Sequence, residues 1–184
     1  MRLLMVAAAA LLIGASTVQA QGPEALAEGR TSIAFAIPQS GSTSFGIWKQ
    51  LSPTRALGLQ GSVLYGRHES EFANHESTQF QISVAPAMKW YRSLTPTVAP
   101  FLRGSVGVGY NRSEQLSGDI RIETDGFNVN ASAGIGVDWF PLRSISIGGF
   151  TGLSGALGRV DSGTERNSLV LGTTTSALTM HIYF

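Results

Sequence analysis

Two short motifs in the sequence place a histidine two residues before a serine, His68-Glu69-Ser70 and His75-Glu76-Ser77. In a β-strand residues i and i+2 share a face, so an imidazole at this spacing can take the proton of the hydroxyl and activate it as a nucleophile. Both motifs lie in or beside a polar stretch, 67–77. We therefore favour a solvated loop over a catalytic pair for both motifs.

A second group of residues suited to chemistry is charged: Lys89, Arg103 and Asp138. Each falls on the small, polar side of an alternating stretch, close to the end that leads into a tight connection. Buried charges persist only when they are paired and hydrogen-bonded. The pattern predicts a structural ion cluster that fills the interior, and a proton or ion path is the alternative. His181, on the polar side of its own stretch, is expected to be an interior hydrogen-bonding residue.

The element that must position Asp138 is the stretch Gly126–Pro141, GFNVNASAGIGVDWFP. Every second residue from Phe127 to Trp139 is apolar, and the intervening residues are small or polar until Phe140. A period of two indicates a β-strand, because successive side chains leave opposite faces. The stretch is longer than the usual strand of a soluble protein, which has about five or six residues. A tilted strand that crosses a bilayer needs about 9–11 residues.

The same alternation recurs along the chain and predicts eight strands. Pro86 lies in the middle of one of them, and because proline lacks a ladder donor we expect a bulge there. The connections after the second, fourth and sixth strands are tight, whereas those after the third, fifth and seventh are about ten residues or longer. The first connection is the exception, because it is short on the side where long loops are expected. Short turns on one side and long loops on the other are typical of an even-numbered membrane barrel. The predicted strands are Arg30–Ile37, Ser42–Leu51, Leu57–Gly66, Gln79–Trp90, Phe101–Tyr110, Gly126–Pro141, Ser144–Leu157 and Ser168–Phe184.

Aromatic residues mark both ends of the apolar faces. From Phe80 to Trp90 is a span of roughly 24 Å, at about 3.4 Å per residue and a tilt near 45°. A lipid-facing band about 25 Å tall between aromatic girdles is what membrane barrels show. The girdle residues are Tyr65, Phe80, Tyr110 and Phe127 at the long-loop end, and Trp90, Trp139 and Phe184 at the tight-turn end.

The first twenty residues have the features of a secretory signal peptide. A positive start at Arg2 is followed by an apolar run, 3–13, and by the small-residue pattern Val18-Gln19-Ala20. Such segments are cleaved on export, and the apolar run is too short to cross a bilayer as a helix. We expect a signal peptide at 1–20, a short and loosely ordered periplasmic lead at 21–29, and one outer-membrane barrel domain at 30–184.

Composition narrows the function classes. Without Arg2 the remaining twelve basic residues balance the twelve acidic ones, so there is no electrostatic reason to expect nucleic acid. The chain has no cysteine, no zinc-like histidine spacing and no phosphate-binding glycine loop, and we expect no metal or cofactor. Charged residues are 14% of the chain, against about 25% in soluble domains. No apolar run of transmembrane-helix length follows the signal peptide.

The strand pattern, GIGVDWFP at 134–141 and the final strand LTMHIYF at 178–184 resemble the small eight-stranded outer-membrane barrels of the OmpA transmembrane-domain, OmpX and opacity-protein type. The resemblance covers about 30–184 and implies an all-β, antiparallel, up-and-down barrel, monomeric and non-enzymatic, in contact with outer-membrane lipids and lipopolysaccharide. It also implies that an assembly machinery reads the last strand through Leu178, Met180, Ile182 and Phe184. The chain ends at the barrel, so cell-wall anchoring through a peptidoglycan-binding domain is not implied.

Two alternatives remain. Outer-membrane lipid A deacylases are also eight-stranded barrels and use a His-x-Ser pair on an outward strand face. Their flanking Phe and Asn are missing here, since Gly66 and Ala73 stand two residues before each histidine and Glu71 and Thr78 follow each serine. A soluble lipocalin-like binder would need a charged outer face. The face opposite the apolar one is instead Ser, Gly, Ala, Asn and Gln, which fits a narrow interior better.

The three long polar stretches carry most of the remaining charge. A solvated rim is the expected role of these residues. A second hypothesis is that the arginines contact lipopolysaccharide phosphates, which suit a guanidinium group. The acidic residues are Glu69, Glu71, Glu76, Glu114, Asp119, Glu123, Asp125, Asp161 and Glu165, and the arginines are Arg67, Arg112, Arg121, Arg159 and Arg166.

Overall fold

Strands make up nearly all of the described chain. The structure is a computed structural model, and it describes residues 23–38, 43–70, 75–92, 94–117, 120–161 and 165–184. The expected signal peptide at 1–20 therefore lies outside the described residues. Across these ranges no helix is long and apolar enough to cross a membrane. The elements in order are η1 (Glu24–Leu26), β1 (Thr31–Pro38), β2 (Ser44–Ser52), β3 (Arg55–Ser70), β4 (His75–Tyr91), β5 (Val98–Ser117), β6 (Ile120–Leu142), β7 (Ile145–Asp161) and β8 (Glu165–Tyr183).

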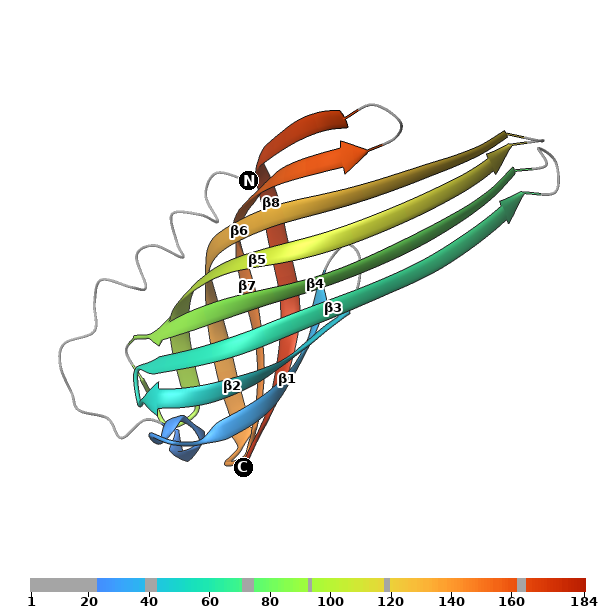
Figure 1. Cartoon of the computed structure of the whole chain (residues 1–184). Helices are drawn as coiled ribbons and strands as arrows, with labels where there is room; N and C mark the ends of the chain where they lie inside the picture. Colours follow the sequence, from blue (N-terminus) through green and yellow to red (C-terminus); the bar gives the residue numbers. More distant parts are fainter. Residues whose placement is uncertain (1–22, 39–42, 71–74, 93, 118–119, 162–164) are drawn as a thin grey trace, which may run out of the picture.

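The eight strands form a closed antiparallel barrel in which each strand pairs with its neighbours in sequence, and β1 pairs with β8 (Figure 1). Thr31 and Phe184 exchange two backbone hydrogen bonds beside the β1–β8 ladder, 3.2 and 2.9 Å long. The predicted fold class and strand number are confirmed. We call the end with the short connections after β2, β4 and β6 the tight-turn end, and the opposite end the hairpin end.

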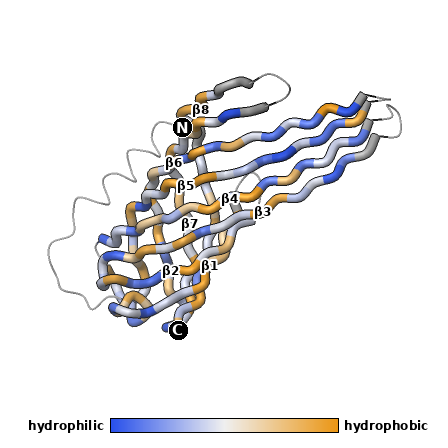
Figure 2. Tube along the Cα trace, viewed as in Figure 1, coloured by the Kyte–Doolittle hydropathy of each residue, from blue (hydrophilic) through white to orange (hydrophobic). Residues whose placement is uncertain are grey.

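Alternate residues of each strand point out of and into the barrel, and Figure 2 shows the resulting alternation of hydropathy along the chain. On β2 the exposed residues Phe45 and Ile47 alternate with the buried Gly46 and Trp48. The interior of the tight-turn end holds a cluster of buried apolar side chains, whereas large apolar side chains on the outside are exposed. The barrel is thus apolar on its outer surface, as the alternation predicts.

The three long connections after β3, β5 and β7 are largely not loops. The β3–β4 ladder continues from Tyr65–Phe80 to Ser70–His75, and the β5–β6 ladder continues to Ser117–Ile120. The expectation of long polar loops is therefore wrong over most of 67–77, 111–125 and 158–167. Strand pairing there requires only backbone donors and acceptors, so polar side chains on both faces do not end it. Figure 1 shows β3 to β6 reaching well past the end of β1 and β2.

The bulge expected at Pro86 is absent. Pro86 pairs with Leu59 of β3 without a change of register, and the β4–β5 register is the same at Val84–Val108 and at Ala87–Ser105. The β4–β5 ladder lacks only the two pairs between these positions. The absent N–H of Pro86 therefore does not cause an extra residue to be inserted in the strand. The register shifts lie elsewhere, between Gln50 and Ser52, between Trp139 and Leu142, and between Ser154 and Gly155.

The expectation of a loosely ordered lead is also wrong for the described residues 23–29. Ala25 and Leu26 of η1 are each only 1% exposed, and they pack inside the tight-turn end of the barrel. Gly29, with φ of 86°, turns the chain from η1 into β1, and its N–H donates to the Gln50 carbonyl at 2.9 Å. Arg30 and Glu24 form an ion pair at 3.2 Å across this turn. The lead is therefore a plug, which we define as residues 23–29.

The packing of Trp48 against β3 leads to a first prediction. Trp48 is 3% exposed and lies opposite Gly58, where an added Cβ would stand 2.6 Å from Trp48 Cε2. Gly58→Ala should lower the free energy of unfolding by about 1–3 kcal/mol, the usual cost of overpacking. Urea unfolding in phosphatidylcholine vesicles measures this difference.

The matched control is Gly66→Ala on the same strand, because an added Cβ there meets nothing within 4 Å. It should unfold within about 0.5 kcal/mol of the wild type. Equal unfolding midpoints for the two variants would show that Trp48 does not pack on Gly58.

Candidate functional site

The interior of the tight-turn end is built around a buried ion pair. Lys89 on β4 and Asp138 on β6 are two strands apart, and both point inward, so their side chains meet across the lumen. Lys89 Nζ donates to Asp138 Oδ2 at 2.8 Å, and the two side chains are 2% and 0% exposed. The Tyr91 hydroxyl donates to the same carboxylate oxygen at 3.0 Å. These contacts supply the partners that a buried charge requires.

His181 on β8 links the ion pair to β1. Its Nε2 lies 3.1 Å from Lys89 Nζ, and its Nδ1 lies 3.2 Å from Ser32 Oγ. An ammonium group can only donate, so Nε2 is assigned as the acceptor and the ring hydrogen is assigned to Nδ1, which donates to Ser32. His181 is 2% exposed. The expectation that it is an interior hydrogen-bonding residue agrees with these contacts.

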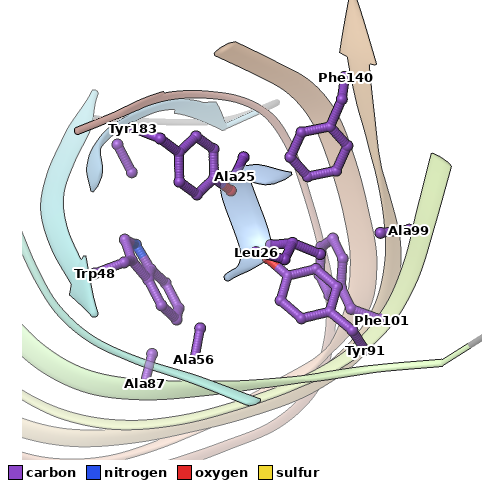
Figure 3. Packing of buried hydrophobic residues seen from close by; sticks show 11 residues of the cluster. Ala25, Leu26, Trp48, Ala56, Ala87, Tyr91, Ala99, Phe101, Phe140 and Tyr183 are labelled. Carbon is purple, nitrogen blue, oxygen red and sulfur yellow. The ribbon is translucent and has the colours of Figure 1, made fainter. Parts of the chain in front are cut away.

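Aromatic rings and the plug enclose the ion pair. Lys89 Nζ lies 4.2 Å from the centroid of the Phe101 ring and 5.3 Å from that of Trp48. Rings at this range stabilise a cation through their π-electron density. Figure 3 shows Ala25 and Leu26 among the rings of Trp48, Tyr91, Phe101, Phe140 and Tyr183. The charged groups are thereby shielded from water at the tight-turn end.

Arg103, which we expected in the same cluster, has other partners. Its guanidinium donates to Gln60 Oε1, and its Cζ lies 4.2 Å from the centroid of the Phe150 ring. The alternation placed Arg103 correctly on the inward face, but it carried no information on which neighbour each interior charge would meet. Arg103 therefore lies beside the Lys89–Asp138 pair as a separate, hydrogen-bonded charge.

The second carboxylate oxygen of Asp138, Oδ1, occupies space that a glycine leaves free. Gly148 of β7 stands opposite Asp138 on one side and Thr179 on the other, and a Cβ at Gly148 would overlap Asp138 Oδ1. Asp138 Oδ1, Ser146 Oγ and Thr179 Oγ1 are buried with no hydrogen-bond partner among the described residues. Only glycine leaves room for the carboxylate at this position.

The His-x-Ser motifs lie on strands rather than in a loop. The ladder places His68 of β3 opposite Ser77 of β4, and Ser70 opposite His75. Tyr65 on the same strand is outward and 66% exposed, so His68 falls on the opposite, inward face by alternation. An outward face is what the resemblance to the deacylases requires, and the strand alternation does not provide it. In the parts of the chain that the structure describes, no group of three or more acidic or histidine side chains could hold a metal ion.

Tyr110 and Phe127 lie on the outward face, and their ring centroids are 5.1 Å apart. From these residues toward the hairpin end, the outward face carries charged side chains. Arg112 contacts Glu114 at 2.8 Å and Glu123 at 3.3 Å, and Arg121 contacts the same two carboxylates. The hydrogen bond and charge of Glu114, with the charge of Glu123, raise the pKa of Arg112. We call Arg112, Glu114, Arg121 and Glu123 the hairpin network.

The residues expected in the aromatic girdles and in the final-strand signal all lie on the outer face of the barrel or at its end. Tyr110 is half-buried beneath Phe127, and the others are exposed. Their exposed fractions range from 36% for Phe80 to 69% for Leu178. Among inward residues, Tyr91 and Ser32 contact the ion-pair site without having been singled out in the sequence. Tyr91 could have been found, because it lies two residues after Lys89 and so shares its face.

Comparison with known proteins supports the fold alone. No family model matches the chain, and no curated protein matches it. Among solved structures, the attachment invasion locus protein Ail of Yersinia pestis is 11% identical with a TM-score of 0.53, covering 85% of this chain and 99% of that one. A major outer membrane protein of Thermus thermophilus is 11% identical with a TM-score of 0.57, covering 84% and 99%. The fold is that of small outer-membrane barrels.

The outer membrane enzyme PagL also aligns, at 12% identity over 83% of this chain and 98% of that one. Its TM-score of 0.30 is too low to support an enzymatic interpretation of this chain. The fold comparison therefore adds nothing to the His-x-Ser motifs.

The ion pair leads to a second prediction, a double-mutant cycle. Asp138→Leu removes one partner and leaves the buried Lys89 charge uncompensated, which should cost about 3–5 kcal/mol of unfolding free energy. Adding Lys89→Met should restore a large part of that loss, because two apolar side chains replace the pair. Urea unfolding of the folded protein in vesicles provides the four free energies.

The control variant is Arg143→Met, since Arg143 is 91% exposed and lies outside the barrel interior. Its effect should be within about 0.5 kcal/mol and additive with Asp138→Leu. Additive effects of Asp138→Leu and Lys89→Met would show that the two side chains are not coupled in the folded barrel.

Proposed function

We propose that this chain is an integral outer-membrane β-barrel protein with a filled lumen, whose structural or surface-interaction role is carried by its projecting hairpins. The observation that carries the proposal is the inverted distribution of polarity. Large apolar side chains such as Phe127 and Ile47 are 68% and 62% exposed, whereas Lys89 and Asp138 are buried inside. Water disfavours such an outer surface, and a bilayer favours it.

The filled interior argues for anchoring rather than transport. The tight-turn end is occupied by the ion pair, the surrounding rings and the plug. An interior space at this end, lined by residues such as Ser32, Trp48 and His181, has no volume that admits a water molecule. An eight-stranded barrel is just wide enough for side chains to fill. A solute would have to displace these buried groups to pass.

The orientation of the barrel in the membrane follows from the difference between its two ends. The tight turns and the plug belong on the periplasmic side and the long hairpins on the external side, since membrane barrels have short periplasmic turns and longer external loops. Export through the signal peptide at 1–20, recognition of the last strand by the assembly machinery, and a monomeric state are parts of the proposal. Leu178 and Phe184, 69% and 61% exposed, are available to such a machinery on the outer face.

The hairpin network supports a contact with lipopolysaccharide phosphates. Arg112 and Arg121 lie on the outward face beyond Tyr110 and Phe127, where lipid head groups meet the barrel. The side chains of Arg112 and Arg121 are 42% and 61% exposed, although they also contact Glu114 and Glu123. A guanidinium group binds phosphate oxygens in a bidentate manner, and the carboxylates hold the two arginines side by side.

The enzymatic and soluble alternatives have less support. His68 and Ser77, one residue from each His-x-Ser motif, lie on the inward face by alternation, away from a lipid substrate outside the barrel. A lipocalin-like binder would keep its apolar face around a ligand, whereas here the interior of the tight-turn end holds buried charges. A non-enzymatic role is therefore the proposal that the geometry supports best.

The third prediction tests the membrane location. The protein should fractionate with the outer membrane and, when unheated, migrate differently on a gel from the boiled sample, because a closed ladder resists detergent. In planar bilayers it should show no steady channel conductance. A periplasmic protein without a heat-dependent shift would contradict the proposal, and a large ohmic conductance would contradict the filled lumen.

The fourth prediction tests the phosphate contact. The double variant Arg112→Gln and Arg121→Gln should bind lipopolysaccharide in nanodiscs about tenfold more weakly, since each charged hydrogen bond contributes about 1.5–3 kcal/mol before partial replacement by water. Arg143→Gln at the tight-turn end should not change binding. Dephosphorylated lipopolysaccharide should bind wild type and double variant equally. If the double variant loses affinity for both forms to the same extent, the arginines do not act through phosphate.

A further inference from the structure

The barrel wall is continuous only toward the tight-turn end. Within the described residues, the β2–β3 ladder stops at the pair Ser44–Ser62 and the β1–β8 ladder stops at Pro38–Ala177. Beyond these pairs β3 continues to Ser70, paired only with β4, and β8 extends from Glu165, paired only with β7. Figure 1 shows the β1–β2 hairpin ending while the other strands continue. We call the gap between β3 residues 63–68 and β8 residues 168–176 the wedge.

The wedge lies at the level of the apolar outer surface. On its β3 side Val63 and Tyr65 are 48% and 66% exposed, and on its β8 side Leu169 and Leu171 are 60% and 73% exposed. These outward side chains place the two strand edges beside lipid in the proposed membrane orientation. Unpaired backbone groups are costly in hydrocarbon, so the edges require water or a ligand.

Gly172 shapes the β8 side of the wedge. Its φ of 83° and the register change between Ser154 and Gly155 mark a bulge, which bends a strand. A residue other than glycine would be strained at this φ. The bulge also shifts the alternation, so that Leu171 pairs with Gly155 and Leu169 with Leu157 of β7. Leucines therefore line the outside of the β8 edge within the wedge.

The interior behind the wedge differs from the interior of the tight-turn end. Its lining includes uncharged hydroxyl and amide side chains that are partly buried, and we call this region the vestibule. Its side chains form pairs across neighbouring strands and along one strand: Ser62 Oγ–Ser83 Oγ at 2.7 Å, Ser105 Oγ–Ser132 Oγ at 2.7 Å, and Asn130 Nδ2–Asn128 Oδ1 at 3.3 Å. Toward the tight-turn end, the vestibule is closed by the ion pair and the plug. It is therefore a dead end, which suits binding rather than conduction.

We propose that the wedge is a lateral opening through which the uncharged, hydroxyl-rich head group of a membrane amphiphile enters the vestibule, while its alkyl chain stays in the bilayer. Hydroxyl and amide side chains are donors and acceptors for the hydroxyl groups of such a head group. The leucine-lined edge accommodates the chain. The alternative occupant is a second copy of the barrel whose strand pairs with one of these edges, and the hydrogen-exchange test below distinguishes it. The proposal adds a ligand site to the membrane barrel proposed above and does not depend on the hairpin network.

The fifth prediction uses dodecyl maltoside as the probe, because it combines an uncharged sugar head with a single alkyl chain. Full-length mature protein in phosphatidylcholine nanodiscs should bind radiolabelled dodecyl maltoside at a saturable site. Ser83→Phe, which fills the vestibule, should weaken binding about tenfold through lost hydrogen bonds. Its neighbour Ile82→Phe, on the outward face of the same strand, should bind as wild type does.

The heat-dependent gel shift shows whether each variant is folded, and Ser132→Leu replaces Ser83→Phe if the latter does not fold. Failure of that shift in the wild type would refute the membrane barrel itself, separately from the ligand site. Equal binding by the vestibule and outward variants would mean that the probe sits on the outer surface, and the proposal would fall.

Hydrogen exchange in the same nanodiscs tests whether the wedge is open. Within 63–66 and 175–176, the amides that point into the wedge, away from β4 and β7, should exchange faster than those of the paired segments 45–48 and 128–131, because water reaches the edges. Slow exchange at both edges would show that another strand, such as one from a second copy, covers them, and would overturn the lateral opening.

Discussion

Closure of the β1–β8 ladder is the constraint on which the rest of this structure depends. In a bilayer every backbone donor and acceptor must find a partner within the protein, and a strand edge exposed to hydrocarbon has none. The bonds between Thr31 and Phe184, together with the pairs from Ser32–Tyr183 to Pro38–Ala177, close the ring at its tight-turn end. Closure creates an interior, and that interior is too narrow to hold bulk water beside large side chains. The strand pairing therefore determines how much room the lumen has for side chains.

The two ends of the lumen are filled in different ways. At the tight-turn end, large side chains such as Trp48 and Phe101 share the lumen with the ion pair. They fit because Gly58 and Gly148 have no side chains. The plug completes the burial of Lys89, which then depends on Asp138 for its charge partner. At the hairpin end several inward residues are uncharged serines and asparagines, which pair through their hydroxyl and amide groups. One barrel thus has a densely filled end and a polar, open end.

The sequence predicted those features that follow from local geometry. A period of two determines which residues face outward, so the inward position of Asp138 and the outward position of Phe127 could be predicted without a structure. The length of β5 and β6 could not, because polar residues on both faces carry no alternation that separates a paired strand from a loop. The partner of Arg103 could not either, since register between distant strands decides whether it meets Asp138 or Gln60. The apolar pair Ala25-Leu26, in an otherwise polar lead, was the available signal for the plug.

The unequal lengths of the hairpins follow from the same constraint of closure. Among the described residues the ring is complete only as far as its shortest hairpin, β1–β2, reaches, and beyond Ser44 the remaining strands form an open sheet with two edges. A sheet edge above the membrane meets water at little cost, whereas an edge within the apolar zone does not. Exposed leucines at 169 and 171 indicate that the β8 edge begins within that zone. The height of β1–β2 relative to the apolar outer surface therefore determines whether this barrel is sealed from the surrounding lipid or open to it.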